Sequence, residues 1–365
     1  MRPLLAIETS CDDTCCAVLS WDGKVLSSVI SSQTEVHAPY GGVVPELASR
    51  HHLMNIPLVV AEALYTAGVQ MTDIGAVAAT NGPGLLGSLL VGLSYGKAAA
   101  SALGVPFYSV NHIEAHLGSP WIEHSEFPYP VLALVASGGH SHLFFCKEAG
   151  ERLLVSATRD DAAGEALDKV AKLIGLPYPG GPWMDKLASR GNPKAVEFPL
   201  PRFNSGEPDY SFSGIKAAAI HRLSSIGVKL PLEGDCGQWP QWAYDLIASF
   251  QKRVVDHLLQ RVRGAALELA PAGIVMAGGV ACNSLLRERI TALANDLGIR
   301  SAFPSTKYCA DNAAMAGFAA LERFRAGAPS EIEADAFPSC AWPRMDLGQA
   351  RPRPKKARPL NKERL

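Results

Sequence analysis

Residues 4–31 read LLAIETSCDDTCCAVLSWDGKVLSSVIS, and this stretch carries most of the information on the fold. Apolar, β-rich runs at Leu4–Thr9 and Cys15–Ser20 predict two buried strands joined by a polar turn. The sequence Trp21–Lys24 is typical of a hairpin turn, so a third strand is expected over Val25–Ser31. The chain therefore begins with a unit of three strands joined by a polar turn and a glycine turn.

The same unit recurs later in the chain. Val131–Ala136, His142–Cys146 and Arg152–Thr158 are apolar, β-rich segments separated by glycine-containing turns. A shift of 127 residues brings the two units into register and places Gly23 on Gly150, which indicates a weak internal duplication. Each unit is followed by helical segments and further expected strands, at Ala76–Thr80, Pro106–Val110, Gly273–Met276 and Arg300–Phe303.

This order of elements predicts an α/β protein with two lobes, each a mixed sheet with helices on both faces. The turns after the first strands would face a cleft between the lobes. We expect an N-terminal lobe over residues 1–125, onto which residues 309–330 pack back, and a C-terminal lobe over residues 126–308. Residues 192–242 are rich in Pro, Gly and aromatic residues and indicate a partly helical insertion. From about Glu331 the chain is expected to be loop-like, and residues 331–365 form a C-terminal extension.

The charge of the chain is unevenly distributed. The 365 residues include 34 Lys and Arg against 35 Asp and Glu, a net charge of -1, and the 48% apolar fraction excludes wholesale disorder. Residues 351–365, RPRPKKARPLNKERL, hold seven basic residues and one Glu, so this tail carries +6 and residues 1–350 carry -7. RNA is therefore not excluded as a partner, but an acidic body needs protein partners or local basic patches to bind it tightly. The tail either adds salt-sensitive affinity for RNA or is a solvated extension without a role.

Cysteine usage and hydropathy predict a cytoplasmic protein with reduced thiols and no membrane span. The eight cysteines form no CxxC motif, and the N-terminus lacks the apolar stretch of a signal peptide. The longest uncharged run, Ile74–Gly96, contains Asn-Gly-Pro-Gly and many small residues. This composition indicates a strand, a turn and a buried helix rather than a membrane span.

Two histidines form the sharpest chemical pattern, in the segment NHIEAH at residues 111–116. Asn111 can cap a helix, with Glu114 at the capping-box position, and His112 and His116 then lie on one helical face. Such a pair can ligate one metal ion, although histidines at this spacing also occur without any such role. The glutamate is the third residue and not the second, which disfavours the metalloprotease motif HExxH.

A metal site needs a third ligand, and Asp311 is the candidate, in the segment YCADNAA at residues 308–314. The ordinary alternative is that Asp311 only caps the helix of small residues that follows. Two histidines and one carboxylate suit iron(II) or zinc and leave coordination positions open for a substrate.

Glycine turns at residues 136–140, 180–181 and 277–280 adjoin apolar segments. Glycine lets backbone N–H groups approach phosphate oxygens closely, so three such turns favour a nucleotide site, although each alone would be an ordinary turn. Neither the P-loop motif nor GxGxxG after a strand is present, which disfavours P-loop and dinucleotide-binding proteins.

Acidic residues in the turns and helices leave two interpretations open. Asp12 and Asp13, in the first turn, could position a metal ion, water or phosphate, or could form a solvated hairpin turn. Asp168 and Asp185 are surface residues of helices unless a ligand engages them. Cys11 has no flanking Lys or Arg that would lower its pKa, so we do not expect it to act as a nucleophile.

Seven motifs, in order over residues 4–325, together resemble the Kae/Gcp/YgjD family, whose bacterial members are called TsaD. They are IETSCDDT at residues 7–14, VPELASRH at 44–51, NGPGL at 81–85, NHIEAH at 111–116, SGGH at 137–140, SFSGIK at 211–216 and GGVACN at 278–283. No single motif is specific, but the ordered set is. The resemblance implies an actin-like two-lobed fold of the ASKHA group, in agreement with the duplication.

The resemblance also implies an activity, a tRNA N6-adenosine threonylcarbamoyltransferase. A threonylcarbamoyl group would pass from threonylcarbamoyl-AMP to N6 of the adenosine 3′ of the anticodon in tRNAs that read ANN codons, and AMP would leave. The donor is an activated mixed anhydride, so no protein nucleophile is required and positioning should supply much of the rate. TsaB-like and TsaE-like proteins are the implied partners.

The implied site residues can be assigned by position. His112, His116 and Asp311 resemble the family's metal ligands, for one iron(II) or zinc ion. We hypothesise that Asp12 lies near the reacting centre. The positions that resemble the family's adenylate contacts are Val135, Ala136, Ser137, Gly138, Gly139, Asp168, Gly181, Asp185 and Asn283.

Three departures from the family pattern stand out: Ala6 in place of a glycine, an apparent insertion at residues 229–242, and the basic tail at 351–365. The main alternative function is an ATP-dependent kinase or ATPase of the same fold, in which the histidine pair would have no role. A non-enzymatic assembly subunit would lack that pair. A glycoprotease is disfavoured by the position of Glu114.

Overall fold

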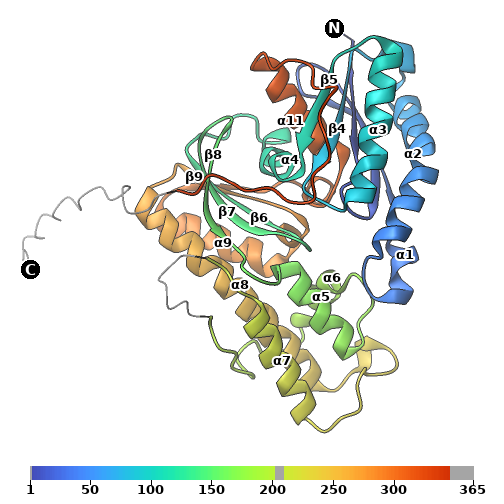
Figure 1. Cartoon of the computed structure of the whole chain (residues 1–365). Coiled ribbons are helices and arrows are strands. Elements are labelled where there is room, and N and C mark those ends of the chain that lie inside the picture. The colour runs from blue at the N-terminus through green and yellow to red at the C-terminus, as the bar shows by residue number, and fades with distance from the viewer. Residues whose placement is uncertain (1, 202–208, 346–365) are drawn as a thin grey trace, which may run out of the picture.

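Two five-stranded sheets form the centre of the molecule in the computed structural model, which describes residues 2–201 and 209–345 (Figure 1). The strands of the first sheet lie in the order β3-β2-β1-β4-β5. Their bounds are β1 (Leu4–Glu8), β2 (Asp13–Leu19), β3 (Val25–Ser32), β4 (Ala76–Gly82) and β5 (Phe107–Asn111). β1, β2 and β3 are antiparallel neighbours, whereas β4 runs parallel to β1 and β5 parallel to β4.

The second sheet repeats this topology, in the order β10-β9-β6-β7-β8. Its strands are β6 (Val131–Ala136), β7 (Ser141–Glu148), β8 (Glu151–Ala157), β9 (Gly273–Ala277) and β10 (Arg300–Ala302). β6, β7 and β8 are again antiparallel, and β9 and β10 are again added in parallel. The predicted duplication is therefore confirmed, and each expected strand is present within two or three residues of its predicted ends.

Helices cover both faces of the first sheet. α2 (Pro45–Ala67) and α3 (Leu86–Leu103) pack on one face, and α11 (Ala313–Arg325) packs on the other. Because side chains alternate along a strand, β1 serves both layers: Leu4 and Ala6 face α11, whereas Leu5 and Ile7 face the α2 side. Short helices follow β3 and precede β4, at α1 (Thr34–His37), η1 (Ala38–Tyr40) and η2 (Met71–Asp73).

The second sheet carries its largest core on the face covered by α5 (Ala163–Ile174), α8 (Gln241–Leu269) and α9 (Ser284–Leu297). Within the expected insertion, residues 192–242, the structure has the helix α7 (Ser213–Ser225) and the short 3-10 helix η4 (Cys236–Gln238) before α8 begins. The remaining elements of this half are α6 (Gly180–Ala188), η5 (Gly279–Cys282) and α10 (Thr306–Cys309). The predicted boundaries of the two lobes stay a prediction.

α4 (His112–Gly118) lies between the two sheets and fixes the position of the site. Ala115 packs into the core beneath the first sheet, whereas Ile113 and Leu117 pack against the open face of the second sheet. η3 (Ser119–Ile122) continues α4 and adds Trp121 to the same contact. A short helix packed on both sides holds its polar side chains rigidly at the junction of the lobes.

The C-terminal segment of residues 331–345, here called the strap, contains no helix but is paired with both sheets. On the first sheet, Glu331 N–H donates to Phe107 O at 2.8 Å and Phe337 N–H donates to Asn81 O at 2.9 Å. On the second sheet, Met345 N–H donates to Leu154 O at 2.9 Å. The loop-like character expected from Glu331 onward is confirmed over residues 331–345. The basic tail at 351–365 lies outside the described residues.

α3 is the one helix in the described part of the chain that is long and apolar enough to cross a membrane by length and composition. One third of that stretch is buried inside the protein, and the helix packs on β4 and α2. Core helices of globular proteins meet the same criteria, so this observation is weak evidence for a membrane span.

Candidate metal centre in the cleft

The end of β5 and the start of α4 place two histidines one helical turn apart. Asn111 caps the helix as predicted, because its side-chain oxygen accepts hydrogen bonds from the N–H groups of Ile113 at 2.9 Å and Glu114 at 3.2 Å. His112 and His116 are 4% and 0% exposed. The Glu114 carboxylate, expected at a capping-box position, instead forms an ion pair with Arg152 of β8 at 3.3 Å.

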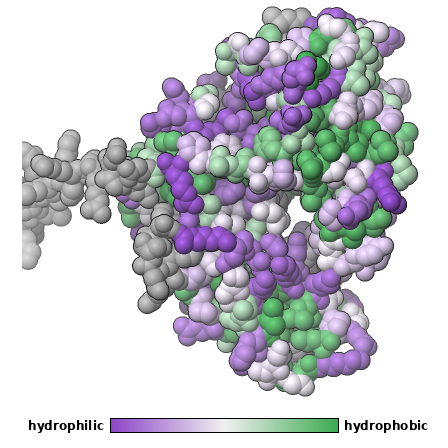
Figure 2. Space-filling view, viewed as in Figure 1, coloured by the Kyte–Doolittle hydropathy of each residue, from purple (hydrophilic) through white to green (hydrophobic). Residues whose placement is uncertain are grey.

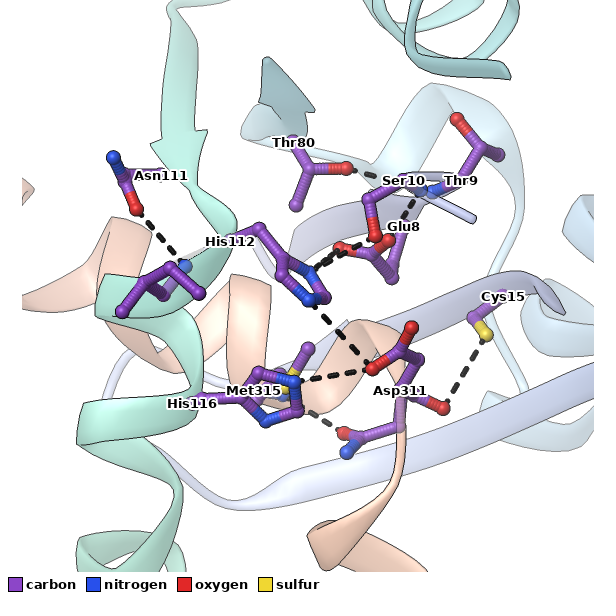
Figure 3. A network of polar contacts seen from close by, with 12 residues as sticks. Glu8, Thr9, Ser10, Cys15, Thr80, Asn111, His112, His116, Asp311 and Met315 are labelled. Atoms are coloured by element: carbon purple, nitrogen blue, oxygen red, sulfur yellow. Dashed lines mark hydrogen bonds and ion pairs between the residues drawn. The ribbon is translucent and has the colours of Figure 1, made fainter. Parts of the chain in front are cut away.

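Asp311 turns its side chain toward both imidazoles (Figure 3). Its Oδ1 lies 3.1 Å from His116 Nε2 and 3.7 Å from His112 Nε2. The alternative role as a helix cap is wrong, because the neighbouring Asn312 caps α11 by accepting from Met315 N–H at 3.0 Å. The carboxylate of Asp311 is therefore available for a ligand, and 22% of this side chain remains exposed.

These three residues fit a metal ion. One ligand atom from each lies within 4.8 Å of the others, and no second such group of His, Cys, Asp or Glu occurs among residues 2–201 and 209–345. Ligands about 2.0–2.2 Å from a shared ion lie about 3–4 Å from one another, which is close to the observed separations. Two imidazoles and one carboxylate leave positions open for a substrate, as in catalytic sites.

The charges in this group are strongly coupled. Burial opposes protonation of His112, but the carboxylates of Asp311 and Glu8 outweigh it and raise the pKa of this histidine to about 9. Burial and the neighbouring His112 lower the pKa of His116. Burial alone would raise the pKa of Asp311, yet the two histidines hold it well below its usual range. Without a metal ion, the site therefore presents an ionised Asp311 carboxylate beside a protonated His112 and a neutral His116, and a bound ion would displace the proton of His112.

A buried carboxylate lies behind His112. Glu8, at the end of β1, is 0% exposed, and its Oε2 lies 3.2 Å from His112 Nδ1. Ser10 Oγ lies 3.0 Å from the same nitrogen, and Ser10 N–H donates to Glu8 Oε1 at 2.5 Å. Glu8 was not singled out from the sequence, because its partner is 104 residues away and no local spacing connects them.

The first turn, which carries Asp12, faces the same centre. Gln33 N–H donates to Asp12 O at 3.2 Å, and His52 Nε2 lies 2.9 Å from Cys11 O, so the turn is held from two sides. Burial raises the pKa of the Asp12 carboxyl, and Asp311 adds to this rise. Burial also raises the pKa of Cys11 well above its ordinary value, which agrees with the expectation that this thiol is not a nucleophile.

The glycine turns of the second lobe border free space. A methyl group at Gly138, Gly139 or Gly279 would meet no atom within 4 Å. Gly278 differs, because its φ is +88° and a Cβ there would lie 2.3 Å from Ala136 O. The end of β6, with Val135 and Ala136, is thus packed directly against the turn after β9 and leaves open backbone on one side.

Asp168, Asp185 and Asn283 are held in place by the starts of helices. Asp168 Oδ1 accepts from the N–H groups of Gly180 at 2.8 Å and Gly181 at 3.0 Å. Asp185 accepts from Ser284 N–H at 3.0 Å and from its hydroxyl at 2.9 Å. Asn283 caps α9, with its side-chain oxygen engaged by Leu286 N–H at 3.0 Å. The two aspartates are thus anchored to helix starts, and Asn283 keeps its NH2 group as a donor.

A pocket of about 180 Å³ lies between the lobes, where Figure 2 shows a hollow. Tyr178 lines this pocket, and burial, followed by the carboxylates of Asp12 and Asp168, raises the pKa of its hydroxyl group. Lys172 crosses from α5 to the first lobe, where its Nζ donates to Tyr40 O at 3.0 Å. The sequence interpretation missed these two residues, as well as His140, whose ring centroid lies 6.2 Å from that of His112. The lining residues are Ala38, Pro39, Gly41, Asp168, Lys172, Leu176, Pro177, Tyr178 and Gly180.

Fold and site together define an actin-like, two-lobed protein with a candidate metal centre in its cleft. The alternative of a kinase or ATPase of the same fold is not favoured, because the histidine pair would have no role there. The chain belongs to the TsaD family, described as tRNA N6-adenosine threonylcarbamoyltransferase, whose sequence pattern matches residues 24–318. The protein is therefore an acyltransferase that modifies an adenosine of tRNA at N6. The resemblance inferred from the seven motifs is confirmed.

Relatives with this activity in their names match nearly the whole chain. One from Pelobacter propionicus is 46% identical over 349 residues, which cover 95% of this chain and 99% of the relative. One from Geobacter sulfurreducens is 47% identical over 348 residues, with the same coverage of both chains. Both are called tRNA N6-adenosine threonylcarbamoyltransferase.

Solved structures with low sequence identity share the fold. HypF from T. kodakarensis superposes with a TM-score of 0.57 at 13% identity and covers 91% of this chain and 49% of its own. Component A of the (R)-2-hydroxyglutaryl-CoA dehydratase of Acidaminococcus fermentans gives a TM-score of 0.52 at 16% identity, with coverage of 89% and 99%. At such identities these likenesses support the actin-like fold alone.

Proposed function

We propose that the donor is threonylcarbamoyl-AMP and that the acceptor is the adenosine immediately 3′ of the anticodon in tRNAs that read ANN codons, with AMP as the leaving group. The observation that carries this proposal is the convergence of three features at the junction of the lobes. These are the histidine–aspartate group, the Asp12 turn and the pocket beside Asp168. A nucleotide-activated acyl donor needs polar backbone near its phosphate and an electrophilic group near its carbonyl. The glycine turns would provide the first, and the histidine–aspartate group could hold a metal ion that provides the second.

The reaction needs orientation more than covalent catalysis, because the carbamoyl carbon of the donor is already activated. A Cβ at Gly138, Gly139 or Gly279 would meet no atom within 4 Å, so the leaving phosphate would have room to approach the backbone N–H groups of these turns. Val135, Ala136, Ser137, Asp168, Gly181, Asp185 and Asn283 complete the proposed adenylate site. Asp12 would lie beside the reacting amine, which is a weak nucleophile and depends on positioning.

We propose His112, His116 and Asp311 as the ligands of one iron(II) or zinc ion. Both ions accept imidazole nitrogen and carboxylate oxygen. When bound, such an ion supplies Lewis-acid polarisation of the threonylcarbamoyl carbonyl. His116 Nδ1 is buried without a hydrogen-bond partner among the described residues, so a ligand at Nε2 would be the main restraint on this ring.

We further propose that the protein works in the cytoplasm with TsaB-like and TsaE-like partners. One side of the first lobe is suited to a protein partner, because α2 and α3 expose a group of apolar side chains where Figure 2 shows hydrophobic surface. Large apolar patches of this kind mark interaction sites on soluble proteins. Their exposed members are Leu53, Met54, Leu58, Tyr65, Leu86 and Leu90.

The test supplies the purified chain with its partner proteins, ATP, threonine, bicarbonate and unmodified tRNA, and measures modified adenosine by mass spectrometry of nucleosides. We expect His112→Ala to abolish the product and to lower the metal content. His221→Ala is the matched control, because it removes an exposed histidine on α7. Full activity of His112→Ala would contradict the metal role, and failure of the wild-type chain to modify tRNA would contradict the activity.

A further inference from the structure

We propose that Glu8 is a positioning residue for the metal centre, whose carboxylate holds His112 in the tautomer and orientation that present Nε2 to the ion. This inference rests on the proposed metal site and adds to it a residue from the first strand of the chain. Glu8 touches neither substrate nor ion in this assignment. It acts through the imidazole of His112.

The contacts of Glu8 are few and specific (Figure 3). Its side chain is 0% exposed, and Oε2 lies 3.2 Å from His112 Nδ1. Oε1 accepts the backbone N–H of Ser10 at 2.5 Å. The two oxygens are thus directed to two different partners, and the backbone bond prevents the carboxylate from rotating away from the histidine.

A neutral imidazole carries one N–H group and one lone pair, so its two nitrogens have opposite roles. An ionised carboxylate can only accept, so Glu8 places the proton of His112 on Nδ1. The lone pair is then on Nε2, which is the nitrogen that faces Asp311 at 3.7 Å. Histidines that ligate metals donate their other N–H to a carboxylate or carbonyl in this way, which fixes the ring and raises its basicity.

Burial of the Glu8 carboxylate would destabilise the fold unless the carboxylate is hydrogen-bonded to a partner such as His112. A fully buried ionised carboxylate is unfavourable unless it is paired and hydrogen-bonded. The strand that carries Glu8 is otherwise apolar from Leu4 to Ile7 and fully buried. An apolar residue at position 8 would suit this strand better, so the carboxylate is best explained by what it does for His112.

The two histidines receive unequal support. His112 Nδ1 has Glu8 and Ser10 within 3.2 Å, whereas His116 Nδ1 is buried and has no partner among the described residues. His112 is therefore the ligand of the pair whose orientation is fixed by neighbouring side chains. Among residues that are not themselves ligands, Glu8 is the one whose mutation should change metal affinity most.

The substitution Glu8→Gln is a sharp test, because it keeps the shape and reverses the hydrogen bond. Ser10 N–H keeps the Gln oxygen on its side, so the new NH2 group faces His112 Nδ1 and donates to it. The proton of the imidazole then moves to Nε2, where the ion should bind. We expect the affinity for Co(II), measured by chelator competition and followed by its visible absorption, to fall about 10–100-fold.

Two controls separate positioning from a general structural effect. Ser10→Ala removes the second contact to Nδ1 and leaves Glu8 in place, so Co(II) affinity should change less than threefold. Glu322→Gln neutralises another carboxylate of the same lobe, which pairs with Arg152, and should leave Co(II) affinity unchanged. Thermal unfolding of each metal-free variant shows whether the fold is intact.

The outcomes distinguish this inference from the proposed function. Co(II) affinity of Glu8→Gln within threefold of the wild type would overturn the role of Glu8 and leave the metal site standing. Wild-type protein that binds no Co(II) would overturn both. If Glu8→Gln does not fold, NMR of 15N-histidine in the wild-type zinc complex decides: a proton on Nδ1 of His112 supports the inference, and a proton on Nε2 overturns it.

Discussion

Asp12 lies between two buried strands, on a turn that the rest of the first lobe holds in place. Gln33 N–H and His52 both bond to backbone carbonyls of this turn, at 3.2 and 2.9 Å. His52 also lies 2.8 Å from Thr14 Oγ1, at the far end of the same turn. The backbone of the turn is therefore held in place by these contacts, and the Asp12 carboxyl also accepts a hydrogen bond from the Cys11 thiol.

We predict that Asp12→Asn lowers the rate of tRNA modification at least about tenfold and leaves the metal content unchanged. A positioned carboxylate that orients or deprotonates an attacking amine typically contributes more than this factor. The measurement is modified adenosine per unit time, together with metal analysis of the purified variant. Asp22→Asn, in the exposed hairpin turn after β2, is the matched control and should keep full activity. Unchanged activity of Asp12→Asn would show that Asp12 lies away from the reacting centre.

Local spacing explains which site residues could be predicted from the sequence. His112 and His116 lie four residues apart, so one helix brings them together without any knowledge of the fold. Asp311 was only a candidate until the structure showed that Asn312 takes over the capping role. Glu8 became visible only in the structure, because its partner His112 is 104 residues away. Tyr178 also depended on the structure, because the folded chain brings the distant Asp12 turn close enough to affect its pKa.

The junction of α7 and α8 contains a buried histidine in a defined protonation state. His257 of α8 is 0% exposed, and its Nε2 accepts the backbone N–H of Ser211 at 3.1 Å. Burial and then Arg261 lower the pKa of His257 to about 4, while Asp160 has the opposite effect. The folded protein thus requires the neutral imidazole at this position.

This arrangement predicts a loss of stability in mild acid. Between about pH 6.5, the ordinary pKa of histidine, and pH 4, the unfolded chain binds a proton at His257 that the folded chain does not. The free energy of unfolding therefore falls as the pH falls from about 6.5 to 4, by up to about 1.4 kcal/mol per pH unit for one group. Above about pH 6.5 the contribution of His257 to stability no longer changes with pH. His142, with a pKa lowered to about 4 mainly by burial, adds in the same direction.

Urea unfolding at pH 7 and pH 5 provides the measurement. His257→Gln keeps an oxygen that can accept the Ser211 N–H but does not titrate, so it should lose less stability than the wild type between the two pH values. Equal losses in both proteins would show that His257 does not control the acid response.

The strands were predictable because their sequence pattern is local and occurs in both halves of the chain. The strands of both sheets follow from apolar, β-rich runs between glycine turns, and the 127-residue shift correctly paired β1 with β6. The course of residues 331–345 was not predictable beyond its lack of helix, since its pairing partners, such as Asn81 and Leu154, are set by the assembled fold.

At the scale of the molecule, charge is divided between an acidic body and a basic end. Residues 1–350 carry -7 and residues 351–365 carry +6. We predict that truncation after Ala350 weakens tRNA binding mainly at low salt, because the tail acts by releasing counterions from phosphates. Binding isotherms at several salt concentrations measure this effect. A variant with all seven tail Lys and Arg replaced by Gln keeps the length and should behave like the truncation. Equal affinity of truncated and full chains at every salt concentration would leave the tail without this role.

The strap makes the two lobes mechanically dependent on each other. Gly84 N–H donates to Pro338 O on the first lobe at 3.3 Å, and Leu154 N–H donates to Pro343 O on the second lobe at 2.9 Å. The five peptide units between these prolines span at most about 18 Å when fully extended. The strap is thus a short connection between the lobes that limits how wide the cleft can open. We predict that any wider opening of the cleft requires the strap to detach from one lobe, so that cleft opening and local unfolding of the strap occur together. Hydrogen exchange at the Phe337 and Met345 amides would report this event.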